Sequence, residues 1–149
     1  MKRSAPLIPV LLLTMLGASA AHAVEYKSVG NNPAVLYNAP TEKGRKVFVA
    51  PRGMPVEVVL TQAGWSKVRD VAGDLAWIEA KALSPKRNVI VTVANLKLHT
   101  NAEEASAIVA TADKGVLLEL AAAPSAGWVK LKHRDGQTGY AKSSEVWGE

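Results

Sequence analysis

Two tryptophans, Trp65 and Trp128, are the side chains of this sequence best suited to contact a ligand. Each directly follows a glycine, and a lysine stands two residues further on, Lys67 in the first case and Lys130 in the second. Residues two apart lie on the same face of an extended strand, so each indole should share its face with a cation. A flat aromatic ring can stack on a sugar or cover a peptide backbone, and a nearby cation can bind a carboxylate. The pattern predicts a recognition surface.

The placement of these tryptophans is open to a second interpretation. Large aromatic side chains are usually mostly buried, so Trp65 and Trp128 would then close the open end of a barrel or fill a contact between two units. The same argument favours core positions for Trp77 and Tyr140. Trp147, near the end of the sequence, is expected to hold the C-terminal segment in place.

The sequence offers no catalytic constellation. It contains no cysteine, which excludes a thiol nucleophile and a disulfide framework. His99 and His133 are the only histidines beyond residue 23, and they lack metal-ligand spacing with each other or with acidic residues. Glu57 and Glu119 alternate with apolar residues on what should be exposed strand faces, whereas the carboxylates of a glycosidase face one cleft. We therefore predict no enzymatic activity, no metal and no cofactor; an unrecognised hydrolase would need a cleft with convergent polar groups.

Most of the chain beyond residue 33 consists of two copies of one sequence pattern. At an offset of 62 residues, Leu36, Gly53, Val56, Glu57 and Val58 correspond to Leu98, Gly115, Leu118, Glu119 and Leu120. After one inserted residue the offset becomes 63, and Gly64, Trp65, Lys67, Val68, Arg69, Gly73, Trp77 and Leu83 correspond to Gly127, Trp128, Lys130, Leu131, Lys132, Gly136, Tyr140 and Val146. Such a long register indicates a duplicated unit.

The elements that position these residues should be short strands. Apolar runs separated by glycine-containing turns are typical of an all-β sandwich or barrel, with strands expected at residues 34–37, 46–49, 56–60, 65–69, 75–78, 96–99, 107–111, 116–120, 128–133 and 138–141. The polar segment 84–88 contains Pro85 and should separate the units. The β-branched segment 89–93 is expected to pair back onto the first unit or to bridge the two. Because units of about 60 residues without disulfides are marginal alone, we expect the two units to pack together.

The first 23 residues predict export. Lys2 and Arg3 precede an apolar stretch over residues 7–16, and small residues at positions 21 and 23 form a cleavage signal, so we expect a signal peptide cleaved after Ala23. Two prolines make a core helix a poor alternative. The expected product is soluble, without membrane insertion after cleavage, and periplasmic or secreted. We favour the periplasm because no anchor or wall-sorting tail follows the second unit.

The charge of the chain argues against a nucleic-acid partner. Without Lys2 and Arg3, the 18 basic residues fall to 16 against 13 acidic ones, a surplus too small and scattered for a nucleic-acid footprint. The densest basic spots lie at residues 86–87 and 130–134. They could favour anionic envelope polymers or lipid headgroups, although such runs are more often simply solvated surface.

In their order, these landmarks resemble the bacterial SH3-like domain, present here as a tandem pair. The resemblance rests on residues 34–40, 51–53, 56–58, 64–69, 76–78 and 82–84 in the first unit, and on Leu98, Gly115, residues 127–131, 139–140 and 146–148 in the second. It implies two small SH3-like β-barrels, residues 24–87 and 88–149, that serve as targeting or binding modules. Two departures stand out: Ala76 replaces the glycine usual before the family's tryptophan, and Asn101-Ala102 stands where a proline is usual.

The resemblance also implies a binding groove. In eukaryotic relatives of this fold, a tyrosine near the first strand and a tryptophan at the position of Trp65 line a groove for proline-rich peptides. Tyr37 and Trp65 occupy these two positions in the first unit, and His99 and Trp128 occupy them in the second. Residues 80–83 lack the proline and tyrosine that would complete the groove. The candidate ligand-binding residues are Tyr37, Arg52, Trp65, Lys67, Arg69, His99, Trp128 and Lys130.

Family members in envelope proteins are commonly linked to peptidoglycan or peptide recognition. The resemblance therefore implies a module that recognises peptidoglycan, its stem peptides or an extended peptide. The alternative is a scaffold whose barrels present an edge strand or a flat face to another envelope protein, which predicts a contiguous apolar patch and no pocket.

Overall fold

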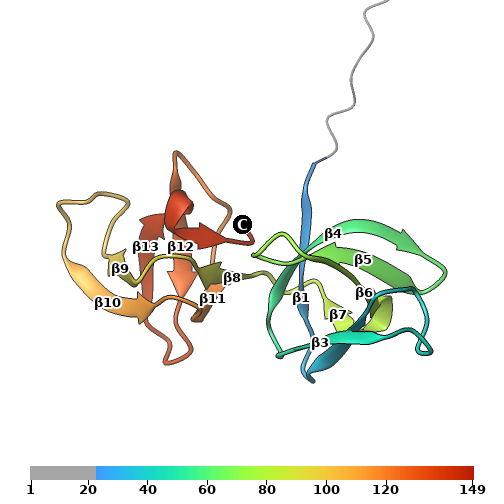
Figure 1. Cartoon of the computed structure of the whole chain (residues 1–149). Coiled ribbons are helices and arrows are strands. Elements are labelled where there is room, and N and C mark those ends of the chain that lie inside the picture. The colour runs from blue at the N-terminus through green and yellow to red at the C-terminus, as the bar shows by residue number, and fades with distance from the viewer. Residues whose placement is uncertain (1–22) are drawn as a thin grey trace, which may run out of the picture.

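The computed structural model describes residues 23–149, and it contains two seven-stranded antiparallel sheets joined by a short segment (Figure 1). The predicted leader, apart from Ala23, lies outside these residues. The all-β class and the packed pair of units predicted from the sequence are confirmed. Over the described residues, no helix has the length and apolar character needed to cross a membrane.

The first unit is a curled sheet with the strand order β3-β2-β6-β5-β4-β1-β7. Its elements are β1 (Glu25–Val29), β2 (Ala34–Tyr37), β3 (Lys46–Ala50), β4 (Pro55–Gln62), β5 (Trp65–Arg69), β6 (Leu75–Glu79), the short 3-10 helix η1 (Ala80–Ala82) and β7 (Leu83–Ser84). The sheet encloses a small aliphatic core of Val29, Leu36, Ala50, Val56, Val68, Ala76 and Ile78. Three of its six strand pairings, β2–β3, β4–β5 and β5–β6, join sequence neighbours, and the other three bring distant strands together.

The second unit repeats the first strand by strand, with the order β10-β9-β13-β12-β11-β8-β14. Its elements are β8 (Asn88–Val91), β9 (Asn95–His99), β10 (Ile108–Asp113), β11 (Leu117–Leu120), β12 (Trp128–Lys132), β13 (Thr138–Lys142), the 3-10 helix η2 (Ser143–Glu145) and β14 (Val146–Trp147). Its core consists of Val89, Val91, Leu96, Leu98, Ala112, Leu118, Val129, Leu131, Ala141 and Val146. Neither core contains a tryptophan.

The structure corrects the expectation for residues 89–93. They neither pair with the first unit nor bridge the two, because β8 pairs with β11 and β14 inside the second sheet. The corresponding strand of the first unit, β1, was not predicted. It pairs with β4 and β7 and buries Ser28 and Val29, although its first three residues are Glu25, Tyr26 and Lys27. Each unit therefore places its own first strand between the fourth strand and a two-residue closing strand.

Asn88, the first residue of β8, ties the second unit to the first. Its side-chain amide donates a hydrogen bond to the carbonyl of Gly53 at 2.9 Å, and its backbone N–H donates to the Ser28 hydroxyl at 3.2 Å. Gly148 approaches the first unit so closely that an added Cβ would lie 2.9 Å from the Cβ of Pro55. Such close backbone approach requires glycine.

Aromatic contacts complete this junction. The rings of Tyr26 and Trp147 meet edge to face with centroids 5.3 Å apart, so Trp147 holds the C-terminal strand against β1. The Arg87 guanidinium lies 5.5 Å from the centroid of the Tyr26 ring and donates a hydrogen bond to the Gly148 carbonyl at 3.0 Å. Partial burial, followed by the carboxylates of Glu57 and Glu149, raises the pKa of the Tyr26 phenol above its ordinary value of 10.0.

One of the inward positions at which the two barrels differ is a close strand crossing. A Cβ added to Gly139 would lie 2.8 Å from the Cβ of Leu98 and 3.0 Å from Cγ2 of Val109, so β13 crosses β9 at a distance that only glycine permits. The corresponding residue of the first unit is Ala76, which is 8% exposed and belongs to the core. The first barrel has therefore made room for the methyl group that the second excludes.

Opposite substitutions at this matched position should have unequal costs. We expect Gly139→Ala to lower the free energy of unfolding by about 1–3 kcal/mol through overpacking, and Ala76→Gly to lower it by about 1 kcal/mol through lost packing and added chain entropy. Urea unfolding followed by tryptophan fluorescence measures both. A Gly139→Ala variant at least as stable as the parent protein would contradict this account of the crossing.

The raised pKa of Tyr26 predicts a loss of stability in alkali. A phenol whose pKa is higher in the folded state contributes stability that is complete below pH 10 and is lost as the pH rises through the folded pKa. Tyr26→Phe keeps the ring contacts but cannot ionise. We expect the urea midpoint to fall more steeply above pH 10 in the parent protein than in Tyr26→Phe; parallel pH profiles would refute the assignment.

Candidate functional site

Strand alternation decides which side chains of β5 reach the surface. Ser66 and Val68 are 2% and 0% exposed and point into the barrel, whereas Trp65, Lys67 and Arg69 are half-buried on the opposite side. This is the division that the sequence predicted from the two-residue period of a strand. The strand β12 shows the same alternation.

A matching turn places each tryptophan at the first position of its strand. Ala63 and Gly64 have φ values of 48° and 82°, and Ala126 and Gly127 have φ values of 50° and 80°. Positive φ at both central residues is the pattern of a type I′ turn, whose twist suits a tight hairpin. An alanine in this left-handed region is strained, yet both units have one. The turn thus fixes the position of each tryptophan at the start of the second strand of its hairpin.

Each tryptophan forms an edge-to-face pair with a ring from another strand. Tyr37 and Trp65 have ring centroids 5.5 Å apart at an interplanar angle of 85°, and His99 and Trp128 have centroids 5.8 Å apart at 89°. Nδ1 of His99 lies 3.1 Å from the Ser106 carbonyl oxygen, which orients the imidazole. The structure therefore confirms that Tyr37 lies beside Trp65, and it places His99 beside Trp128 in the same way.

A lysine and a further aromatic residue extend each pair. Lys67 stands opposite Trp77 in the β5–β6 register, and Lys130 stands opposite Tyr140 in the β12–β13 register. Nζ of Lys130 lies 5.8 Å from the centroid of the Tyr140 ring. We call these surfaces the first aromatic face, made of Tyr37, Trp65, Lys67 and Trp77, and the second aromatic face, made of His99, Trp128, Lys130 and Tyr140. Within the first face Tyr37 is buried, at 8% exposed, so it supports the Trp65 ring and offers little surface to a ligand.

The prediction of core positions for Trp77 and Tyr140 is wrong. Both are half-buried on the outer side of their sheets, because their strand neighbours occupy the inward positions. Ala76 and Ile78 fill the first core beside Trp77, and Ala141 fills the second beside Tyr140. A barrel interior of this size accepts small aliphatic side chains and leaves the large rings outside. Trp77 and Tyr140 therefore belong to the aromatic faces, although the sequence analysis did not include them among the candidate ligand-binding residues.

A hollow adjoins the second aromatic face. It has a volume of about 560 Å³ and is lined by Ala102, Ala122, Ala123, Ser125, Ala126, Trp128, Lys130 and Tyr140. Small side chains, two aromatic rings and one lysine line this hollow, a composition that suits a ligand site. The alanine run that precedes Pro124 is the sequence signal that could have indicated this wall.

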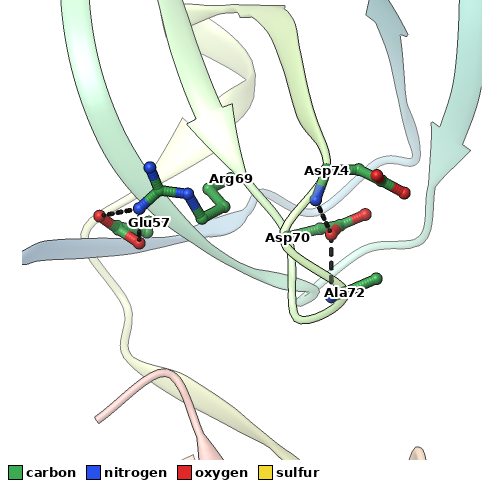
Figure 2. Close-up of polar contacts among 5 residues, drawn as sticks. All are labelled: Glu57, Arg69, Asp70, Ala72 and Asp74. Carbon is green, nitrogen blue, oxygen red and sulfur yellow. Dashed lines mark hydrogen bonds and ion pairs between the residues drawn. The ribbon is translucent and has the colours of Figure 1, made fainter.

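Arg69 is already engaged by a partner within its own sheet. Its Nη1 donates to both carboxylate oxygens of Glu57 at 2.8 Å each, across the β4–β5 register (Figure 2). The side chain of Glu57 is 20% exposed, so the pair is partly sheltered from water. Next to it, Oδ1 of Asp70 accepts hydrogen bonds from the backbone N–H groups of Ala72 and Asp74, which closes the β5–β6 turn (Figure 2). We assign Arg69 a stabilising role in the sheet.

Arg52 also stands apart from the aromatic faces. It is exposed in the turn between β3 and β4 and lines a different hollow, which lies between the two units. The other six predicted residues form the two aromatic faces. In residues 23–149, no group of three or more histidine, aspartate or glutamate side chains is arranged to hold a metal ion.

Opposite charges border the two faces. Trp65 is paired in register with Glu79, which binds Lys81 at 2.7 Å, whereas the matching partner of Trp128 is Lys142. Lys142 forms an ion pair with Glu104 from the β9–β10 loop. Their hydrogen bond lowers the pKa of the Glu104 carboxyl and raises that of the Lys142 ammonium. The duplicated unit has thus kept its aromatic rings and exchanged an acidic residue beside the tryptophan for a basic one, each of them held in an ion pair.

Comparison with known proteins identifies the fold of both units. A family profile described as "Bacterial SH3 domain" matches residues 30–85 and again residues 92–148. These segments contain both aromatic faces. A search of curated proteins finds no matching sequence.

Three solved structures are similar to this chain at low sequence identity. NlpC2 and NlpC1 from Trichomonas vaginalis are 13% and 14% identical, with TM-scores of 0.39 and 0.40, over 85% and 93% of this chain. An NlpC/P60 family protein from Bacillus cereus ATCC 10987 is 16% identical, with a TM-score of 0.37, over 83% of this chain. The matched regions cover 49%, 51% and 56% of those proteins, so this chain spans about half of their length.

A double-mutant cycle tests the role given to Arg69. Replacing Arg69 and Glu57 by alanine, singly and together, should reveal a coupling energy of about 1 kcal/mol, because Nη1 of Arg69 contacts both carboxylate oxygens and the pair is partly buried. The matched control is the ion pair of Lys86 with Glu119, the counterpart of Glu57. It is longer, at 3.1 Å, and more exposed, and we expect it to couple by less than about 0.3 kcal/mol. Equal couplings in urea unfolding would contradict the difference.

Proposed function

Because the chain belongs to the bacterial SH3 domain family through both of its units, we propose that it is an exported, non-catalytic binding module. Domains of this family are typically binding modules, and the two family matches cover residues 30–85 and 92–148 with no match to a catalytic domain. The apolar, small-residue leader over residues 1–23 supports export to the periplasm or beyond.

The proposed ligand is peptidoglycan, its stem peptides or another extended peptide of the cell envelope. The hollow beside Trp128, with its two rings and one lysine, is the observation that carries this proposal. Its apolar walls suit a sugar ring or the backbone of an extended chain, which can stack on an indole without a deep pocket. Lys130 at its edge suits a carboxylate, a group that stem peptides carry.

The second aromatic face is proposed as the stronger site because the hollow adjoins it. The charges beside the two faces do not separate them. Glu79 beside Trp65 is paired with Lys81, and Lys142 beside Trp128 is paired with Glu104. Each face also contains one lysine, Lys67 or Lys130, that suits a carboxylate.

One observation favours a second candidate, a scaffold for another envelope protein. The strand β3 lies at one end of its sheet and pairs with β2 alone among residues 23–149. Val47, Phe48 and Val49 on this strand are 41%, 50% and 61% exposed. A free edge with apolar side chains is a template for pairing with a strand of another protein. In this alternative the partner adds to the edge of the first barrel.

A pulldown on insoluble peptidoglycan separates the two candidates. Under the first proposal the purified protein is retained. Trp128→Ala should reduce retention at least about tenfold, which corresponds to about 1.4 kcal/mol, because it removes the ring on which the ligand stacks. Trp65→Ala should reduce retention less, because the hollow lies beside Trp128. Phe48→Ala is the matched control, since it removes an exposed ring of the β3 edge and leaves both aromatic faces intact.

Circular dichroism and the urea midpoint establish that each variant is folded before retention is compared. If Phe48→Ala loses retention and the two tryptophan variants do not, the result would favour the β3 edge as the binding surface. If the parent protein is not retained at all, the peptidoglycan proposal fails, and in vivo crosslinking from a photoreactive residue at position 48 tests the protein-partner alternative.

A further inference from the structure

A second hollow lies between the two units, on residues that the aromatic faces do not use. It has a volume of about 500 Å³ and is lined from both sides: Arg52 and Gly53 come from the first unit, and Glu119, Lys132 and Arg134 from the second. Lys86, from the segment that joins the units, also lines it. We call this hollow the inter-unit cleft.

Positive charge dominates the inter-unit cleft. Four basic side chains line it, Arg52, Lys86, Lys132 and Arg134, together with one acidic side chain, that of Glu119. That carboxylate lies 3.1 Å from Nζ of Lys86 and opposite Lys132 in the strand register. Within residues 23–149, Arg52, Lys132 and Arg134 make no ion pair. Three cations therefore remain uncompensated around one cavity.

The remaining polar groups at the cleft add little negative charge. His133 lines it too, and its Nδ1 lies 3.0 Å from a carboxylate oxygen of Asp135. Asp135 also accepts a hydrogen bond from the backbone N–H of Gln137, which lowers the pKa of its carboxyl. This carboxylate is thus committed to its own turn, next to Arg134. The side chains of Arg52, Lys132 and Arg134 are exposed and can move toward a ligand.

The junction holds the two halves of the cleft in fixed relation. Asn88 donates to the carbonyl of Gly53, the residue after Arg52, and to the hydroxyl of Ser28. The turn that carries Arg52 is therefore tied to the first strand of the second barrel. Arrangement of like charges from two domains around a rigid cavity is unfavourable by itself and becomes favourable when an anion enters.

We propose that the inter-unit cleft binds an oligomeric oxyanion, in which consecutive phosphate or carboxylate groups bridge Arg52 of the first unit to Lys132 and Arg134 of the second. Guanidinium groups bind both oxyanions through paired hydrogen bonds, and lysine adds a mobile point charge. An anionic envelope polymer is the ligand class that presents such groups in series. This site is separate from the aromatic faces and does not depend on their function.

Titration of the purified protein with tripolyphosphate, and in a parallel arm with citrate, tests the proposal by calorimetry at low salt. The cleft variant replaces Arg52, Lys132 and Arg134 by glutamine. The control variant removes the same charge at Lys43, Arg45 and Lys46, which are exposed and do not line the cleft. We expect the cleft variant to bind at least about tenfold more weakly and the control within about twofold of the parent protein. The single variant Arg134→Gln, in an exposed turn, should show an intermediate loss.

Each outcome decides the proposal. Tighter binding of tripolyphosphate indicates a phosphate polymer, and tighter binding of citrate a carboxylate polymer. Equal losses in the cleft and control variants would show a general effect of net charge and overturn the site, as would failure of the parent protein to bind either probe. The cleft variant should keep its retention on peptidoglycan if the aromatic faces mediate it, so failure of one proposal is distinguishable from failure of the other.

Discussion

The two-residue period of the strands is the constraint on which the rest of this structure depends. Each barrel encloses a small core whose inward positions hold mainly valine, leucine, isoleucine and alanine, most of them completely buried. Without cysteine, these side chains supply the stability of each unit. Every residue between them must then face outward. Large rings that do not fit inside gather on the outer surface of β2, β5 and β6 and of β9, β12 and β13, where they form the aromatic faces.

The sequence predicted the parts of this fold that local pattern controls. The strands at residues 34–37 and 65–69 have the predicted bounds, and the inward and outward residues of β5 follow from alternation alone. A local sequence pattern does not show which strands pair over long distances in the sequence. Nothing in residues 25–29 signals that Ser28 will be buried, and residues 89–93 are equally β-branched whichever sheet they join. The size of the Trp77 side chain suggested that it would be buried. Its strand neighbours Ala76 and Ile78 point inward, however, so Trp77 lies on the outer side of the sheet, beside Lys67.

Comparison of the two units shows where a duplicated barrel can change. Inward positions stay mostly aliphatic; the exceptions include Ser66, which corresponds to Val129, and Gly139, which corresponds to Ala76 at one strand crossing. Outward positions change more: Tyr37 corresponds to His99, Trp77 to Tyr140, and Glu79 to Lys142. The edge-to-face geometry survives these exchanges, since both ring pairs remain near perpendicular at similar separation. Shape has been retained on the aromatic faces while their electrostatic character has diverged.

The reversed charge beside Trp65 and Trp128 has a consequence for how one small protein meets a mixed population of ligands. Identical copies would compete for the same molecules and add only local concentration. The two copies here are not identical. The residue paired with Trp65 is acidic and has Lys81 as its partner, whereas the residue paired with Trp128 is basic and has Glu104 as its partner. The copies therefore differ in where each charge lies relative to the indole, and a ligand with a charge at a fixed distance from a stacked group would fit one copy better than the other.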